Sequence, residues 1–112
     1  MNRKGQPFAK DAEIAWADAA PGIRRKVLCH DYTIMVARFA FEKGAVGAEH
    51  SHPHKQCSVI ESGVFDVTIA GKTERLSAGD SYFVPPNAVH GATSVEAGVI
   101  VDAFSPMRED FV

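Results

Sequence analysis

The sequence is poor in the features that mark several protein classes. It has only two cysteines, Cys29 and Cys57, in unrelated contexts and without a CxxC spacing. This argues against a zinc knuckle or a redox pair and favours two buried, reduced thiols. No run approaches the ~20 apolar residues that span a bilayer, and positions 1–21 lack the apolar stretch of a signal peptide. We therefore expect a cytoplasmic protein with no membrane partner.

An excess of charge of one sign is also missing. The 12 Lys and Arg residues and 14 Asp and Glu residues give a formal net charge of −2, with no block of like charges. This balance argues against nucleic acid as the main partner. A length of 112 residues fits one domain, near the small end of what encloses a core of its own.

Short runs rich in Val, Ile, Phe and Thr follow one another from Ile23 onward, separated by Gly, Pro and Asn, as is typical of antiparallel strands. Gly71 between two such runs predicts a tight hairpin turn at residues 70–72. The expected strands are residues 24–30, 33–42, 56–62, 64–70, 72–77, 81–84, 89–94 and 97–104.

Residues 1–21 carry Gly, Pro and an Ala-rich stretch, which predicts an N-terminal arm with a short helical turn at most. The strands over residues 22–112 must hide their hydrophobic faces in two facing sheets or a closed barrel. The predicted fold is therefore all-β, with a short N-terminal arm followed by a single jelly-roll β-barrel domain.

Four of the five histidines cluster in sequence or follow a rigid turn. In a strand, residues two apart share a face, so His50 and His52 present two imidazoles side by side, and Gln56 can join them. A hairpin-rich fold could bring His90, which follows Pro85-Pro86, to this pair as a third nitrogen ligand. The alternative is that these are surface or capping histidines.

The other two histidines and Gln56 also have ordinary interpretations. A glutamine can hydrogen-bond within a barrel without binding a metal. His54 follows Pro53, and we expect it at the rim of the site rather than among the ligands. His30 stands alone and is expected to be a structural histidine.

Two motifs resemble those of the cupin superfamily. The first is Gly44, His50-x-His52, Gln56 and Gly63, with Gln where the family usually has Glu. The second is Gly79, Pro85-x-Asn87 and His90, with Asn87 in place of the usual Gly and Ser94 in place of the usual Asn. The resemblance implies a cupin β-barrel with a metal ion inside.

A closer resemblance is to the KdgF-like family of pectin-degradation cupins. It rests on GIRRKVLCH, EHSHPHKQ, GDSYFVPPNAVH and DAFSPMRED, over roughly residues 22–111, while Lys55 stands where relatives tend to carry Glu. The resemblance implies one divalent metal ion on four ligands: His50, His52, Gln56 and His90. It also implies that three tail residues lie near the substrate: Asp102, Phe104 and Arg108.

The chemistry of this ligand set favours an anionic partner. Three imidazoles and an amide oxygen carry no charge, so a divalent ion keeps its double positive charge and attracts a carboxylate or a developing enolate oxygen. Such ligands suit Zn, Ni, Fe, Co or Mn. We therefore expect one divalent transition metal as cofactor and an anionic substrate, which the resemblance implies is a small sugar acid.

The resemblance implies an enzyme that opens and tautomerises 4,5-unsaturated monouronates from pectin or alginate breakdown. Asp102, which interrupts an apolar strand, would carry the proton, Arg108 would hold the carboxylate, and Phe104 would form an apolar wall. Without the resemblance, the ordinary interpretation is that Phe104 belongs to the hydrophobic core and that Arg108 is a surface residue. The alternative functions are a metal cupin dioxygenase and a uronate-binding cupin without turnover.

We also expect a homodimer. A barrel this small buries limited surface by itself and leaves edge strands that a second copy can cover.

Overall fold

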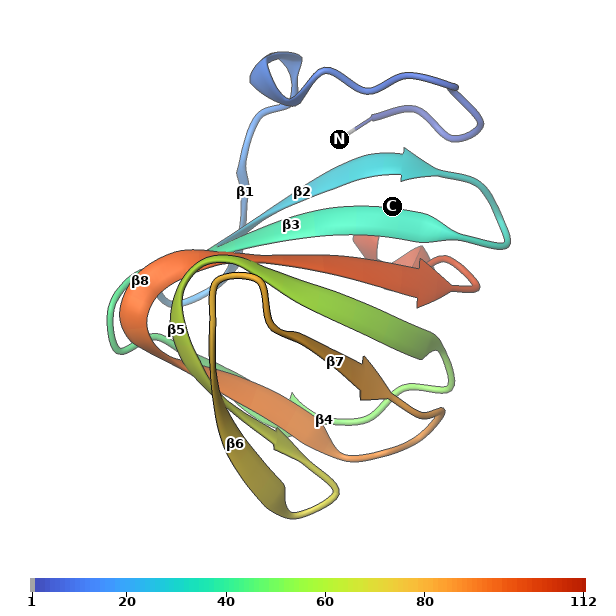
Figure 1. The fold of residues 1–112 in the computed structure, drawn as a ribbon. Coiled ribbons are helices and arrows are strands. Elements are labelled where there is room, and N and C mark those ends of the chain that lie inside the picture. The colour runs from blue at the N-terminus through green and yellow to red at the C-terminus, as the bar shows by residue number, and fades with distance from the viewer. Residues whose placement is uncertain (1) are drawn as a thin grey trace.

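The computed structural model describes residues 2–112, and over these the chain forms eight strands and two one-turn 3₁₀ helices (Figure 1). The helices are η1 (Asp11–Glu13) and η2 (Glu109–Phe111). The strands are β1 (Ala17–Ala20), β2 (Ile23–His30), β3 (Met35–Phe41), β4 (Val46–His50), β5 (Lys55–Ile69), β6 (Lys72–Ser77), β7 (Ser81–Val84) and β8 (His90–Ser105). No helix among these residues is long and apolar enough to cross a membrane.

The long strands β5 and β8 are neighbours in the middle of the sheet. They pair antiparallel from Lys55 opposite Ser105 to Ile69 opposite His90, and the register shifts where both strands bend. At the bend the main chains of these two strands approach each other closely. A Cβ atom on Gly63 would lie only 2.6 Å from the Ala97 carbonyl oxygen. A Cβ on Gly98 would overlap the Ser62 carbonyl oxygen. Glycine is therefore required at this crossing.

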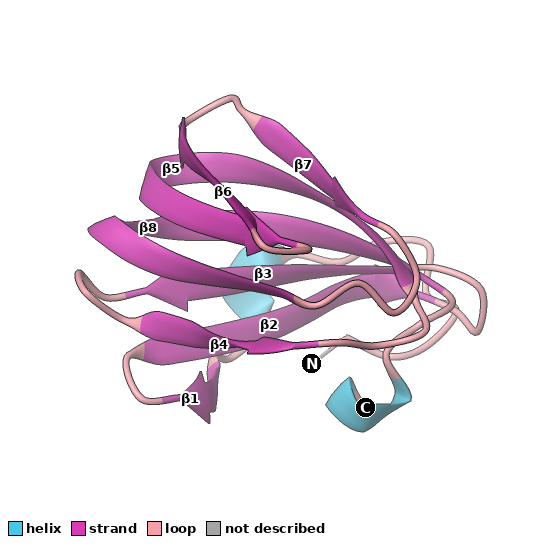
Figure 2. Cartoon of the chain, turned by 90° about the horizontal axis from the view of Figure 1, so that it is seen from below, coloured by secondary structure: helices cyan, strands magenta, loops and turns pink. Residues whose placement is uncertain are grey.

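The bend divides the sheet into two facing parts. One part contains β1, β2, β3, the second half of β8, the first half of β5 and β7. The other contains β4, the first half of β8, the second half of β5 and β6. Figure 1 shows the two parts diverging from the bend toward an open end, and Figure 2, seen from below, shows that strands make up most of the molecule. This arrangement confirms the all-β, jelly-roll prediction.

The hydrophobic core lies between these two parts. Near the bend, Phe41 and Phe65 pack edge to face with ring centroids 5.1 Å apart. Toward the open end, Met35 and Phe104 are buried with Met107 of the C-terminal tail. Burying a side chain of this size stabilises the fold by about 1.5–3 kcal/mol. The second cluster therefore anchors the tail beside the open end.

Several elements differ from the sequence expectation. The runs 56–62 and 64–70 form one bent strand, β5, and 89–94 and 97–104 form another, β8. β1 and β4 were not expected as strands. β1 lies in the segment predicted to be an arm, and it pairs with β2. The division of the chain at residue 21 stays a prediction.

The predicted hairpin is confirmed, because Ala70 and Gly71 join β5 to β6 with φ angles of 49° and 84°, as a tight two-residue turn requires. The burial of the thiols was predicted wrongly. Both cysteines are free, but Cys57 is exposed and Cys29 is partly exposed. Cys57 alternates with the buried Gln56 and Ser58, so its side chain lies on the outer face of β5.

Candidate metal centre

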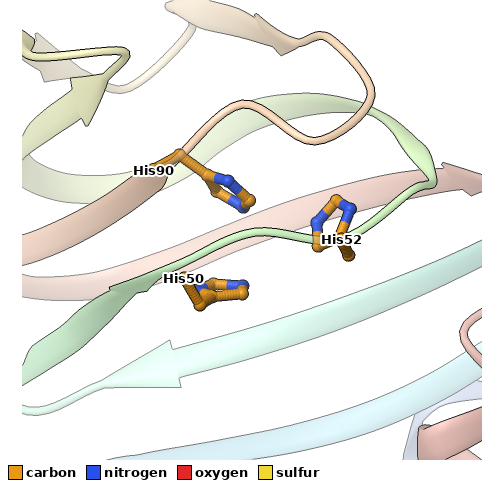
Figure 3. Close-up of side chains that lie close together, drawn as sticks. All are labelled: His50, His52 and His90. Carbon is orange, nitrogen blue, oxygen red and sulfur yellow. The ribbon is translucent and has the colours of Figure 1, made fainter.

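Three histidines meet at the open end of the fold. His50 ends β4 and lies opposite His90, the first residue of β8, and His52 lies in the loop before β5. Each offers a ring nitrogen, and these atoms all lie within 4.8 Å of one another. Figure 3 shows the three rings gathered around a common point. His52 and His90 are buried, and His50 lies at the exposed side of the group.

Backbone carbonyls fix the orientation of these rings. The Nδ1 atoms of His50 and His90 lie 2.9 Å from the carbonyl oxygens of Ala48 and Ala88. An Nδ1–H that donates to a carbonyl leaves the Nε2 lone pair for another partner. His90 Nε2 is buried and has no hydrogen-bond partner among residues 2–112. The arrangement therefore presents nitrogen lone pairs to the centre of the group.

His52 gives a stricter test of whether a cation fits. Its Nδ1 lies 3.1 Å from the His54 carbonyl oxygen, and its Nε2 lies 2.9 Å from Oε1 of the Gln56 side chain. Both neighbours are acceptors, whereas a neutral imidazole has a single N–H. One contact therefore places two lone pairs against each other, and a metal ion between them would relieve this. The residues present fit a divalent ion.

Burial keeps these imidazoles in the form that binds metal. It lowers the pKa of His52 and of His90 below the usual value for histidine, although hydrogen bonds to Gln56 and to Ala88 partly oppose this. Both rings are therefore neutral at pH 7. Neutral imidazole is the metal ligand, so no proton needs to be displaced from these two rings when an ion binds.

A buried polar network connects the Gln56 amide to Asp102. Gln56 donates from Nε2 to Ser58 Oγ at 3.0 Å, and Ser58 Oγ donates to Asp102 Oδ1 at 2.5 Å. The strand register explains the alignment, because Ser58 lies opposite Asp102 on β8 and opposite Tyr82 on β7. Since the Ser58 hydroxyl hydrogen is directed to the carboxylate, the Gln56 amide nitrogen faces Ser58, and its oxygen faces His52.

Asp102 is positioned to exchange a proton near neutral pH. Its side chain is 7 % exposed, and burial raises its pKa to about 6, against the opposing effects of the Ser58 hydrogen bond and the Arg108 charge. The nearby Tyr82 hydroxyl stays protonated, because burial and the Asp102 charge both raise its pKa. A carboxyl group whose pKa lies this close to neutrality is suited to acid–base chemistry.

The C-terminal tail closes one side of the site. Near the end of β8, just before the tail, the Phe104 ring is buried with its centroid 5.8 Å from that of the His52 ring. Arg108 follows, with a side chain that is 12 % exposed, and donates from Nε and Nη2 to the two carboxylate oxygens of Asp110 at 3.0 and 2.9 Å. Arg108 is therefore a largely, though not fully, buried part of the cavity wall and not a surface residue.

Two histidines outside the group have structural partners. His54 was expected at the rim, but it is buried, with Nε2 3.0 Å from the Met107 carbonyl oxygen. It fastens the tail to the loop that carries His52. His30 is also buried, and its Nδ1 lies 3.0 Å from the Leu28 carbonyl oxygen.

These groups share one cavity of about 290 Å³ between the two parts of the sheet. Of the residues singled out in the sequence, its wall includes His50, Gln56, His90, Asp102, Phe104 and Arg108. His52 adjoins it through Gln56. The candidate metal ligands and the candidate catalytic residues therefore meet in one place.

Sequence reasoning missed three polar residues of this region. Ser58 shares strand parity with Gln56, which was a usable signal. Arg25 and Tyr82 also line the cavity. Arg25 alternates with the buried Ile23 and Val27, so the inward-facing parity of β2 could have indicated it.

The chain is similar in sequence to proteins of a known family. Residues 37–104 match the cupin domain. The pectin degradation protein KdgF of Dickeya dadantii (strain 3937) is 38 % identical over 104 residues, covering 91 % of this chain and 94 % of that protein.

Two solved structures are similar over nearly the whole chain. KdgF from Halomonas sp. is 37 % identical with a TM-score of 0.91, over 96 % of this chain and 99 % of that one. An RmlC-like cupin from Shewanella frigidimarina NCIMB 400 is 39 % identical with a TM-score of 0.94, over 96 % and 97 % of the two chains.

Proposed function

The chain belongs to the cupin family, in its KdgF-like branch, and from this premise we propose that it opens and ketonises 4,5-unsaturated monouronates. The observation that carries the proposal is the position of Asp102, a buried carboxyl group in the same cavity as the histidine cluster and Arg108. Pectin degradation, in the name of the similar protein from Dickeya dadantii, supports the choice of substrate class.

The proposed metal ligands are the three clustered histidines and the Gln56 amide oxygen. Two observations support this ligand set. His52 Nε2 lies 2.9 Å from the Gln56 Oε1 acceptor, and among residues 2–112 the buried His90 Nε2 has no hydrogen-bond partner. A bound divalent transition metal would supply a Lewis acid that stabilises negative charge on a substrate oxygen. Because all four ligands are neutral, the site favours an anion.

The reaction is an isomerisation without a redox step. The C1 hydroxyl of the cyclic sugar loses a proton and the bond between C1 and the ring oxygen breaks, so C1 becomes an aldehyde. The ring oxygen stays on C5 and takes up a proton, which gives the enol. The enol oxygen then loses its proton, C4 gains one, and C5 becomes a ketone. Asp102 is the proposed carrier of these protons, since its pKa of about 6 leaves both of its forms populated near neutral pH.

The remaining cavity residues have binding roles in this proposal. Arg108 contributes positive charge for the substrate carboxylate, and Phe104 forms the apolar wall beside His52. A volume of about 290 Å³ lies just below the ~300–1,000 Å³ range of ligand pockets. It is therefore suited to a single sugar unit rather than to an oligosaccharide.

The experiment that tests this function follows the ultraviolet absorbance of the C4=C5 double bond. Metal-loaded wild type should remove the absorbance faster than the spontaneous rate, and His50→Ala/His90→Ala should lose this excess. Absence of any excess in the wild type overturns the proposal. Binding of the sugar without turnover would indicate the uronate-binding alternative, and oxygen consumption the dioxygenase.

A further inference from the structure

The cavity contains a second arginine that has no assigned role. Arg25 lies on β2 between the inward-facing Ile23 and Val27, and its side chain lines the cavity. It is partly buried, and burial lowers the pKa of its guanidinium group, with Asp110 opposing and Arg108 reinforcing this effect. An arginine stays charged at any physiological pH, so the cavity holds a partly desolvated cation here.

The two arginines differ in how their guanidinium groups are paired. Arg108 is bound in bidentate geometry by Asp110, which occupies its Nε and Nη2 edge. Burial raises the pKa of Asp110, but the hydrogen bonds and the positive charge of Arg108, with smaller contributions from a backbone hydrogen bond and His54, together lower it below its ordinary value, so Asp110 is ionised at neutral pH. Among residues 2–112, Arg25 has no ion pair and no side-chain hydrogen bond. The unmatched cation in the cavity is therefore Arg25.

One aromatic ring holds both guanidinium groups in place. The ring centroid of Phe111, in η2, lies 4.1 Å from the guanidinium carbon of Arg25 and 4.3 Å from that of Arg108. A guanidinium group stacked on a ring keeps its in-plane N–H groups available, and these match a carboxylate with two parallel hydrogen bonds. The tail thus orients Arg25 without using its donors.

From this geometry we infer that Arg25 binds the carboxylate of the sugar acid, with Arg108 as the flanking cation that Asp110 holds in position. The inference rests on the proposed function for the identity of the substrate. It assigns carboxylate recognition to a residue on the rigid sheet, about eighty positions before the tail residues that complete the site.

A binding measurement tests Arg25 separately from catalysis. The probe is D-galacturonate, a saturated uronate that lacks the reacting double bond, and D-galactose is its neutral counterpart. Calorimetry on metal-loaded protein compares the wild type, Arg25→Gln, Arg25→Lys and Arg24→Gln. Arg24 is the matched control, because it is the adjacent arginine on β2 but is exposed on the outer face.

Arg25→Gln should weaken galacturonate binding at least about tenfold, the scale of one lost charged hydrogen-bond pair, and should leave galactose binding unchanged. Arg25→Lys should recover part of the affinity, because it restores the charge without the fork. Arg24→Gln should bind as the wild type does. Equal galacturonate affinity in the wild type and Arg25→Gln overturns the inference.

A kinetic comparison separates this inference from the proposed function. With the unsaturated uronate, Arg25→Gln should raise KM more than it lowers kcat. Turnover by the wild type with an unchanged KM in Arg25→Gln refutes the role of Arg25 alone. Galacturonate binding that depends on Arg25, without turnover of the unsaturated sugar, refutes the proposed function alone. A wild type that neither binds nor converts refutes both.

Discussion

Replacing Asp102 with asparagine removes the proton carrier while it nearly preserves the shape of the side chain. The carboxyl group is almost fully buried and accepts a hydrogen bond from Ser58 Oγ at 2.5 Å, which an amide oxygen can also accept. The fold and the metal should therefore remain. A general acid or base contributes about 10²- to 10⁴-fold, so we expect kcat to fall by that factor, a barrier increase of about 2.7–5.4 kcal/mol.

The assay is the metal-loaded rate of C4=C5 absorbance loss after subtraction of the spontaneous rate. Asp66→Asn is the matched control, because Asp66 is also a β5–β8 sheet carboxylate but pairs with Arg75 at 2.9 and 3.1 Å on the outer surface. It should keep the wild-type rate. A metal-loaded Asp102→Asn protein with the wild-type kcat would refute the proton-carrier role.

The same variant also tests the raised pKa of Asp102, because this pKa makes the free energy of unfolding of the wild type depend on pH. The folded-state pKa of about 6 lies above the ordinary value of 3.8, so the folded protein binds this proton more tightly than the unfolded chain does. The stabilisation is complete below pH 4 and is lost as the pH rises through 6. Metal-free wild type should therefore lose up to about 3 kcal/mol relative to Asp102→Asn between pH 4 and 8 in urea unfolding. A pH-independent difference contradicts this.

Arg108, the metal ligands and the oligomeric state can each be tested separately. Arg108→Ala should raise KM, with a smaller fall in kcat, because a cation near the substrate carboxylate acts largely on ground-state binding; steady-state kinetics with an unchanged KM would contradict this. The wild type should hold about one divalent ion per chain and His50→Ala/His90→Ala none, and equal metal by elemental analysis would exclude the ligand assignment. The chain should form a homodimer through the outer face of β5 and β7, where Val59 and Phe83 are 47 % and 51 % exposed; Phe83→Glu should give monomers by light scattering, and a monomeric wild type refutes the prediction.

The sequence predicted most strand positions but not where strands continue. Gly63 and the Ala97-Gly98 pair look like breaks, because glycine weakens a strand interior. In the structure they mark the bend of β5 and β8, where only glycine permits the two backbones to approach so closely. β4 was missed because VGAEH has little β propensity, and its pairing with β8 provides the hydrogen bonds that hold it extended.

Some residues of the candidate site could be recognised from the sequence, and others only from the structure. His50 and His52 were recognisable because their spacing is local, and the motif around His90 supplied the third histidine. Ser58 shares strand parity with Gln56, but its hydrogen bond to Asp102 depends on the register with a partner forty-four positions away. Arg25 required knowledge of which face of β2 is inward and of how Phe111 folds back. Long-range register and tail packing are tertiary properties, and local pattern does not encode them.

The proposed function requires that this chain converts an unsaturated monouronate to its open-chain ketone. Proton NMR spectroscopy of monomeric 4,5-unsaturated galacturonate, with and without metal-loaded protein, follows this conversion. We expect the vinyl C4 proton signal to disappear faster with protein than without it, as signals of the C4 methylene of the ketone appear. Equal rates of disappearance in the two samples would contradict the proposed function.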